Sequence, residues 1–485
     1  MSESKQQNVG AKVVSGFRWL ALGRLASQAG TWVVTLVVIR LLAPEDYGLM
    51  AMATMVIGFF ALFEEFGMGA ALTQRSELEE GVAGKVFGVV ITTNACAALV
   101  LLAIAAPVAR FFEEPRLVDI IHVLTLRFPL LALISVPQAM LARRMQFKRK
   151  ATVEFLAMIT GSLVSLGLAL SGAGVWALVW GSVGATIVRA TGMNLAVRFF
   201  EMPRFSLRGM REVVTFGGQL TVNRILWYFY AQADVFVIGR LLGKEVLGVY
   251  AVAMQLAKLP MQKLGAIVNE VGFAGFSRLQ SDREEIARQF VRAASLISVF
   301  AFPVFFGISS VAPELVLVVL GPGWTDAILP LQLLSLVCPI RMLNQVLNSA
   351  LLGVGRADLC LRNTVVLAVV LPLGFVFGAR YGLAGVCWVW LLGFSLCFGV
   401  ILLWSLPVLG VAVMRYLGAT MGVGLSATAM WGSVTLAREG AEAAGFNAGL
   451  MLLLALVVTG AAAFALLAFT LHRSSVDLVL RLVRR

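Results

Sequence analysis

Apolar runs of about 20 residues recur along almost the whole chain from Val13 onward, and short clusters of charged residues, proline and glycine separate them. A bilayer core about 30 Å thick is crossed by a helix of roughly that length, and a helix satisfies its own backbone hydrogen bonds in lipid. Hydrophobic residues make up 60% of the sequence and charged residues 13%, and the mean hydropathy is +0.90. This balance leaves little room for a soluble domain. The sequence therefore predicts an all-α polytopic membrane protein.

Dividing the chain at the polar clusters predicts about 14 transmembrane helices. The N-terminal segment 1–30 lacks a compact apolar core followed by a small-residue cleavage site, so we expect it to be retained as part of the first helix. The predicted spans centre near Val33, Val56, Ala97, Leu130, Val164, Val183, Phe229, Gln255, Phe300, Leu334, Val369, Val389, Ser426 and Leu456.

Cysteine and histidine usage argues against metal chemistry. The five cysteines show no CxxC spacing, and the chain has only two histidines. Neither a disulfide framework nor a zinc site is predicted, and no metal-binding residue is proposed.

Basic residues concentrate in alternate loops. One set includes "ARRMQFKRKA" and the C-terminal "HRSSVDLVLRLVRR", whereas the opposite set includes "LLAPEDYG" and "AREGAEAAGFNAG". Lys and Arg accumulate on the cytoplasmic side of short loops, so we expect both termini in the cytoplasm. The net charge of +13 is explained by this bias, and no soluble basic domain that could bind nucleic acid is predicted.

One motif occurs twice. "RLLAPEDYGLMAMA" at 40–53 returns as "RLLGKEVLGVYAVA" at 240–253 with half of the residues identical, and the match extends back to Arg24 and Arg224. We interpret each copy as the turn joining the first two helices of a six-helix repeat. An even number of spans separates the copies, which predicts parallel repeats with a substrate site between them and alternating access. We predict an N-lobe at 1–200, a C-lobe at 201–406, and two additional helices with a cytoplasmic tail at 407–485.

Polar side chains at helical spacing inside the spans predict a cavity with more bases than acids. Guanidinium and ammonium groups suit phosphate oxygens, while amides and aromatic faces suit sugars. The same arginines could instead pair with carboxylates or, like Arg40 and Arg240, snorkel to an interface. The candidate substrate-binding residues are Arg24, Gln28, Asn223, Arg224, Trp227, Lys258, Arg341, Gln345 and Asn348.

Carboxylates within the spans are candidates for energy coupling. Asp234 lies near Arg240 in sequence, and Glu65 and Glu270 are alternatives. Such a group could carry a coupling proton or cation, or it could form a structural ion pair.

Several motifs also resemble a known family, the polysaccharide transport family of Wzx-type flippases. They are "VIRLLAPEDYGLMAMA", "FGMGAALTQR", "FKRKATVEF", "GVWALVWG" and "ADVFVIGRLLG". The resemblance places the chain in the multidrug, oligosaccharidyl-lipid and polysaccharide exporter (MOP) superfamily. It implies two six-helix lobes in a V around a central cavity, with two extra C-terminal helices.

That resemblance implies a function without bond making or breaking. The expected activity is translocation of undecaprenyl-pyrophosphate-linked oligosaccharide across the bacterial inner membrane for exopolysaccharide, O-antigen or capsule synthesis. No cofactor is expected apart from a coupling proton or sodium ion. The expected partners are the lipid-linked oligosaccharide, the bilayer, and a polysaccharide polymerase with its export machinery.

Other functions remain as alternatives. A peptidoglycan lipid-precursor flippase would carry the same pyrophosphate, and a multidrug antiporter would share the duplicated architecture. Cationic drugs, however, favour an acidic cavity. A membrane glycosyltransferase or polymerase would need catalytic acids on a sizeable outer loop, and the predicted outer loops are short. An ATP-driven pump would need a phosphate loop, and "GRLLGKE" is one residue short of that motif.

Overall fold

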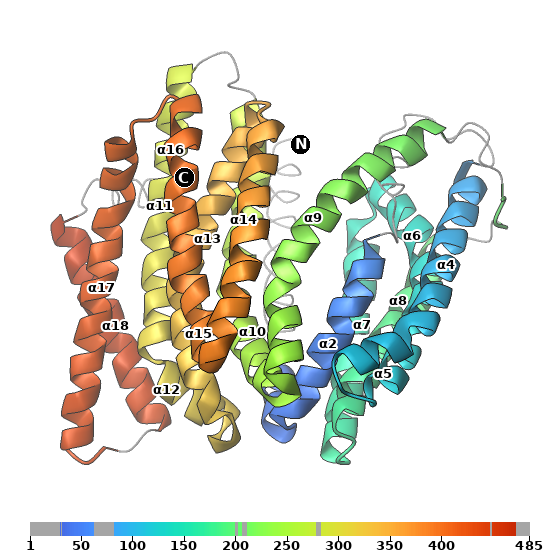
Figure 1. Ribbon diagram of the computed structural model, residues 1–485, viewed down its shortest axis with the longest axis horizontal. Coiled ribbons are helices and arrows are strands. Elements are labelled where there is room, and N and C mark those ends of the chain that lie inside the picture. Colours follow the sequence, from blue (N-terminus) through green and yellow to red (C-terminus); the bar gives the residue numbers. More distant parts are fainter. Residues whose placement is uncertain are drawn as a thin grey trace, which may run out of the picture. The chain divides into compact units, whose positions relative to one another are not determined.

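The computed structural model describes residues 30, 32–62, 82–198, 202–205, 211–277, 283–446 and 449–471. Within this part the fold is all-helical (Figure 1), and every predicted span centre lies inside a helix. Seven helical stretches of the described part are long and apolar enough to cross a membrane. The prediction of an all-α polytopic membrane protein is confirmed. The seven stretches are Gly84–Phe111, Leu117–Arg143, Phe147–Leu170, Arg283–Ser310, Pro322–Gly353, Ala357–Val408 and Leu450–Ala468.

The described helices group into two compact units, the first formed by segments 1–43, 56–110 and 114–221. In this first unit Ser165 Oγ of α7 donates a hydrogen bond to the Ala177 carbonyl of α8 at 2.9 Å, and Asn194 Nδ2 of α8 donates to the Leu133 carbonyl of α6 at 2.8 Å. These contacts hold α8 between α6 and α7. The helices of this unit are α4 (Val82–Phe111), α5 (Leu117–Thr125), α6 (Arg127–Arg143), α7 (Phe147–Leu170) and α8 (Val175–Val197).

The second unit holds segments 44–55, 111–113 and 222–485, so the start of α2 (Pro44–Ala61) belongs to it. Helix α13 is central, because it packs against both α10 and α11 and against the segment from α14 to α16. Its further helices are α9 (Arg211–Leu241) from residue 222 onward, α10 (Gly243–Ser277), α11 (Arg283–Ser310), α12 (Ala312–Leu315), η1 (Val316–Leu320), η2 (Pro322–Ala327), α13 (Ile328–Gly353), α14 (Ala357–Gly378), η3 (Ala379–Tyr381), α15 (Gly382–Trp388), η4 (Val389–Gly393), α16 (Phe394–Val408), α17 (Val413–Ala443) and α18 (Leu450–Leu471). The lobe boundaries at 200 and 406 remain predictions.

The two copies of the repeated motif form the expected helix–turn–helix connections and also touch each other. One copy leads into α2 at Pro44, and the other leads from α9 into α10 at Gly243. A Cβ added to Gly48 would lie 2.6 Å from the carbonyl carbon of Lys244, and one added to Gly248 would lie 2.6 Å from that of Pro44. Equivalent residues of the two copies therefore make reciprocal contacts, which only glycine permits at this separation.

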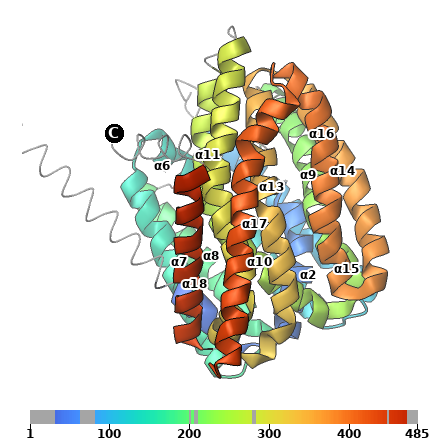
Figure 2. The ribbon, with the colours of Figure 1, turned by 90° about the vertical axis from the view of Figure 1, so that its left-hand side faces the viewer.

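The helices after Pro407 are fastened to the end of α11 and to α12. Arg438 of α17 forms an ion pair with Glu314, with Nε 2.5 Å from Oε1, and its Nη2 also donates to the Ser310 carbonyl. Glu314 is only 2% exposed. Val434 of α17 joins Val311, Leu453 and Leu456 in an apolar cluster, and Figure 2 shows α17 lying beside α18 and α11. These two helices are therefore an integral part of the second unit.

Candidate functional site

A buried carboxylate lies among aromatic donors in the second unit. Asp234 of α9 is 2% exposed, and Tyr250 of α10 donates its hydroxyl to Oδ2. The Trp390 indole N–H of η4 lies 3.2 Å from the same oxygen and 2.8 Å from the Tyr250 hydroxyl. The backbone N–H of Val235 lies 2.7 Å from Oδ1. Neutral donors thus satisfy both carboxylate oxygens, as burial of an anion requires.

Two cations lie near this carboxylate and its donors. The guanidinium carbon of Arg341 on α13 is 4.5 Å from the centroid of the Trp390 ring, a cation–π contact. The Nη1 atom of Arg341 is 3.7 Å from the Met254 sulfur. Lys258 of α10 is within electrostatic range of both Arg341 and Asp234. We call Asp234, Tyr250, Lys258, Arg341 and Trp390 the α9–α13 cluster.

The α9–α13 cluster has an excess of positive charge. Within the described residues, neither Arg341 nor Lys258 has a carboxylate oxygen within 4.0 Å, and Asp234 is occupied by neutral donors. Two cations therefore share one nearby carboxylate without a direct ion pair. An arrangement of this kind in a membrane-spanning helix bundle can accept an anionic ligand.

Amide side chains extend the α13 face beyond Arg341. Asn344, Gln345 and Asn348 follow at spacings of three, four and seven residues, which places them on one side of the helix. The Oδ1 atoms of Asn344 and Asn348 are buried and accept no hydrogen bond within the described residues. These oxygens are suited to hydroxyl donors, because buried polar atoms are rarely left unpaired.

The predicted residues thus fall into three groups. The structure brings Asp234, Lys258 and Arg341 together, with Gln345 and Asn348 on the same face of α13. Trp227 of α9 is 56% exposed and makes none of the contacts of the α9–α13 cluster. The remaining candidates cannot be placed: Arg24, Gln28 and Glu65 lie outside the described residues, and the side chains of Asn223, Arg224 and Glu270 lie outside the described part of α9 and α10.

Arg240 does not pair with Asp234, near which the sequence places it. Its Nη2 atom lies 3.0 Å from Oε1 of Glu113, and its guanidinium carbon lies 5.6 Å from the centroid of the Phe111 ring. Six residues separate Arg240 from Asp234, and at about 100° per residue they lie on different faces of α9. Asp234 and Arg240 therefore do not form an ion pair with each other in the structure.

Tyr250 and Trp390 were not among the sequence candidates. Tyr250 occupies the position in the second copy of the repeated motif that Met50 occupies in the first. This replacement of an apolar side chain by a hydroxyl-bearing one is a signal that the sequence offers. Trp390 lies in a run of apolar residues and resembles an ordinary core residue. A π-helical turn at Val389–Gly393 contains it, and such turns are frequent at functional sites.

In the first unit, an arginine is paired directly with a glutamate. Arg189 of α8 lies 2.8 Å from Glu154 of α7 and 3.5 Å from the Gln138 side-chain oxygen of α6. The arginine and the glutamate neutralise each other. This pair is therefore a weaker candidate for binding an anion than the α9–α13 cluster.

The chain resembles known proteins over most of its length. A family model described as polysaccharide biosynthesis protein matches residues 37–329. The chain is 27% identical to the succinoglycan biosynthesis transport protein ExoT of Rhizobium meliloti (strain 1021), over 79% of this chain and 78% of that protein. It is 24% identical to the lipopolysaccharide biosynthesis protein WzxC of Escherichia coli (strain K12), over 77% of each.

Solved structures show the same fold at low sequence identity. The lipid II flippase MurJ in an inward closed conformation matches with a TM-score of 0.75 at 13% identity, covering 93% of this chain and 99% of that one. An inward-facing multidrug resistance MATE family transporter of the MOP superfamily matches with a TM-score of 0.63 at 16% identity, covering 78% and 94%. The chain therefore has the fold of MurJ and of the MATE transporter, and it belongs to the polysaccharide biosynthesis protein family.

Proposed function

We propose that the protein translocates an undecaprenyl-pyrophosphate-linked oligosaccharide from the inner to the outer leaflet of a bacterial inner membrane. The observation that carries this proposal is the cationic excess of the α9–α13 cluster, where Arg341 and Lys258 have no direct carboxylate partner in the described residues. A pyrophosphate supplies the anion that such a pair accepts. Membership of the polysaccharide biosynthesis protein family and similarity to a succinoglycan biosynthesis transport protein support a glycosylated lipid as the molecule that carries this pyrophosphate.

Different side chains bind the pyrophosphate and the sugars. Arg341 binds phosphate oxygens through two parallel N–H donors, and Lys258 adds a point charge. Gln345 and Asn348 lie one and two turns further along α13, where their amides accept and donate hydrogen bonds to sugar hydroxyls. No bond is made or broken, so the work of the protein is binding and alternating access.

Trp390 offers a route by which substrate binding and Asp234 affect each other. One face of its ring carries Arg341, and its N–H donates to Asp234 and Tyr250. A phosphate that binds Arg341 and moves it away from the Trp390 ring also changes the hydrogen bond that Trp390 donates to Asp234. If Asp234 carries a coupling proton or cation, the two binding events influence each other equally in both directions.

The decisive experiment is a chromosomal deletion analysed for lipid-linked intermediates. The proposal expects an intact oligosaccharide lipid to accumulate facing the cytoplasm, and expects export to return when the wild-type gene is supplied. Accumulation of incomplete glycans would instead indicate a synthetic role, and unchanged export together with lost drug resistance would indicate an antiporter. Either result contradicts the proposal.

Point variants tie the activity to the cluster. Arg341→Gln should reduce export about tenfold or more, because charge-assisted contacts contribute roughly 1.5 to 3 kcal/mol. Arg362→Gln is the matched control, since Arg362 also stacks on an indole ring, that of Trp404 at 4.4 Å, away from the cluster. Equal export by both variants at equal protein levels would exclude Arg341 from substrate binding.

A further inference from the structure

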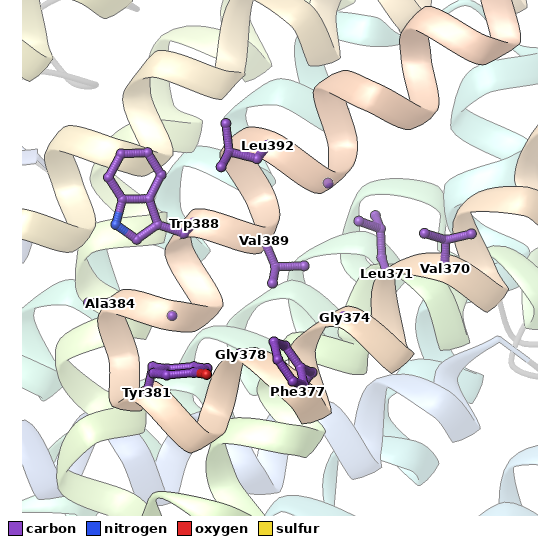
Figure 3. A pocket seen from close by; sticks show the side chains of 12 residues that line it. Val370, Leu371, Gly374, Phe377, Gly378, Tyr381, Ala384, Trp388, Val389 and Leu392 are labelled. Atoms are coloured by element: carbon purple, nitrogen blue, oxygen red, sulfur yellow. The ribbon is translucent and has the colours of Figure 1, made fainter.

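An apolar groove opens between α14 and the segment formed by α15 and η4. Its volume is about 500 Å³, within the size range of small-molecule sites. Val370, Phe377, Val389 and Leu392 line it, and Figure 3 shows them around the gap between the two helices. Glycines form much of the floor: a Cβ on Gly378 would lie 2.8 Å from the Gly385 carbonyl oxygen. The close helix crossing thus leaves a recess lined by hydrocarbon.

One end of this groove carries aromatic and cationic groups. Tyr381 lies beside Phe377 at the end nearest the connecting turn, with ring centroids 5.7 Å apart. The guanidinium carbon of Arg380 is 5.9 Å from the centroid of the Phe377 ring. Arg380 is exposed, and it has no carboxylate partner in the part of the chain that the structure describes. The groove is therefore apolar along its length and positive at one end.

An apolar groove with a cation at one end fits a phospholipid. An acyl chain fills an apolar recess, and the phosphate of the same lipid complements an arginine beside an aromatic pair, the arrangement typical of a membrane interface. We infer that the groove between α14 and α15–η4 binds one anionic glycerophospholipid, with an acyl chain against Val389 and Leu392 and the phosphate at Arg380.

The bilayer lipid is favoured over the hydrocarbon tail of the transported substrate. The proposed pyrophosphate site lies at Arg341, next to Trp390, whereas the groove has its own cation at Arg380. Val389 and Leu392 line the groove, while Trp390 between them is buried against Tyr250 and Asp234. One π-helical turn therefore separates the lipid groove from the α9–α13 cluster, and each site has a separate cation for a separate phosphate.

Native mass spectrometry of the purified full-length protein tests this inference. Phosphatidylglycerol, phosphatidylethanolamine and a polyprenyl phosphate are supplied separately at matched concentrations. Wild-type protein should retain phosphatidylglycerol in preference to the other two. Arg380→Gln should weaken that retention about tenfold, because it removes a charge-assisted contact. Arg362→Gln removes the same charge from α14 outside the groove and should retain the lipid normally.

A second variant tests the apolar part of the groove. Leu392→Trp places a larger apolar side chain at a position that is 55% exposed, so the fold should persist while the groove is filled, and a thermal unfolding midpoint measured without added lipid verifies this. Lipid retention should fall in this variant as well. Equal retention by wild type, Arg380→Gln and Leu392→Trp would overturn the inference, and so would a preference for polyprenyl phosphate. Because the readout is lipid binding, either result leaves the proposed transport activity untouched.

Discussion

Replacing Gly48 by alanine tests the contact between the two copies of the repeated motif. The new Cβ would lie 2.6 Å from the carbonyl carbon of Lys244 and nearer still to its oxygen. The obstacle is backbone, so no side chain can rotate aside, and the start of α2 must separate from α10. We expect Gly48→Ala to destabilise the folded protein by about 2–3 kcal/mol, in the upper range for overpacked interiors.

Gly248→Ala perturbs the same crossing from the other helix, where the added Cβ would meet the carbonyl group of Pro44. A single separation of the helices relieves both clashes, so the double variant should cost clearly less than the sum of the single variants. Gly418→Ala is the matched control. Gly418 lies within α17 and a Cβ there would meet nothing within 4 Å, so its effect should stay below about 1 kcal/mol.

Thermal unfolding of the purified variants in one detergent provides the measurement. The single variants at positions 48 and 248 should unfold at clearly lower temperature than wild type, while Gly418→Ala should not. Two outcomes would refute the reasoning: a Gly48→Ala protein as stable as Gly418→Ala, or a double variant whose cost is strictly additive. The second would mean that the two glycines do not share one contact.

Three further outcomes are expected. Arg438→Met should destabilise the protein by about 3–5 kcal/mol because it leaves the buried Glu314 carboxylate unpaired, and adding Glu314→Leu should recover most of the loss in the unfolding midpoint. Reporter fusions after Lys150 should read cytoplasmic and fusions after Trp324 external; the reverse at Trp324 would overturn the equivalence of the two halves. Asp234→Asn should lower export and its dependence on ion gradients, and unchanged values for both would remove Asp234 from coupling.

The helices were predictable because hydropathy is a local property. A membrane-spanning helix must be apolar along its own length, so each predicted span centre falls inside a helix of the described part. The second unit's connection of α9 to α10 was predictable for the same reason, since the turn residues interrupt the apolar run. Hydropathy does not reveal which helices touch, and the reciprocal packing of Gly48 and Gly248 depends on tertiary structure.

The charged members of the site were also accessible from sequence. Asp234, Lys258 and Arg341 stand out because ionisable residues inside apolar spans are costly and therefore rare. Trp390 does not stand out, because buried aromatic residues are ordinary components of a core, and Tyr250 is marked only by its difference from Met50 in the first copy of the repeated motif. Their role as donors to Asp234 arises only when α9, α10 and η4 meet, and no local pattern encodes that meeting.

The duplicated arginines remain a prediction. Arg24 lies outside the described residues, and the side chain of Arg224 lies outside the described part of α9. We expect both to contribute to phosphate binding, so export should fall with Arg24→Ala and with Arg224→Ala and fall less with lysine at either position. Full export by the double alanine variant would restrict substrate binding to the α9–α13 cluster.

The most direct test of the central claim is transport by the purified protein in liposomes. A fluorescent undecaprenyl-pyrophosphate oligosaccharide is incorporated, and its arrival at the opposite leaflet is followed by a membrane-impermeant quencher. Wild-type protein should move the lipid faster than empty liposomes, Arg341→Gln should slow it about tenfold or more, and Arg362→Gln should leave it unchanged. Transport by Arg341→Gln at the wild-type rate, or wild-type transport no faster than in empty liposomes, would contradict the account.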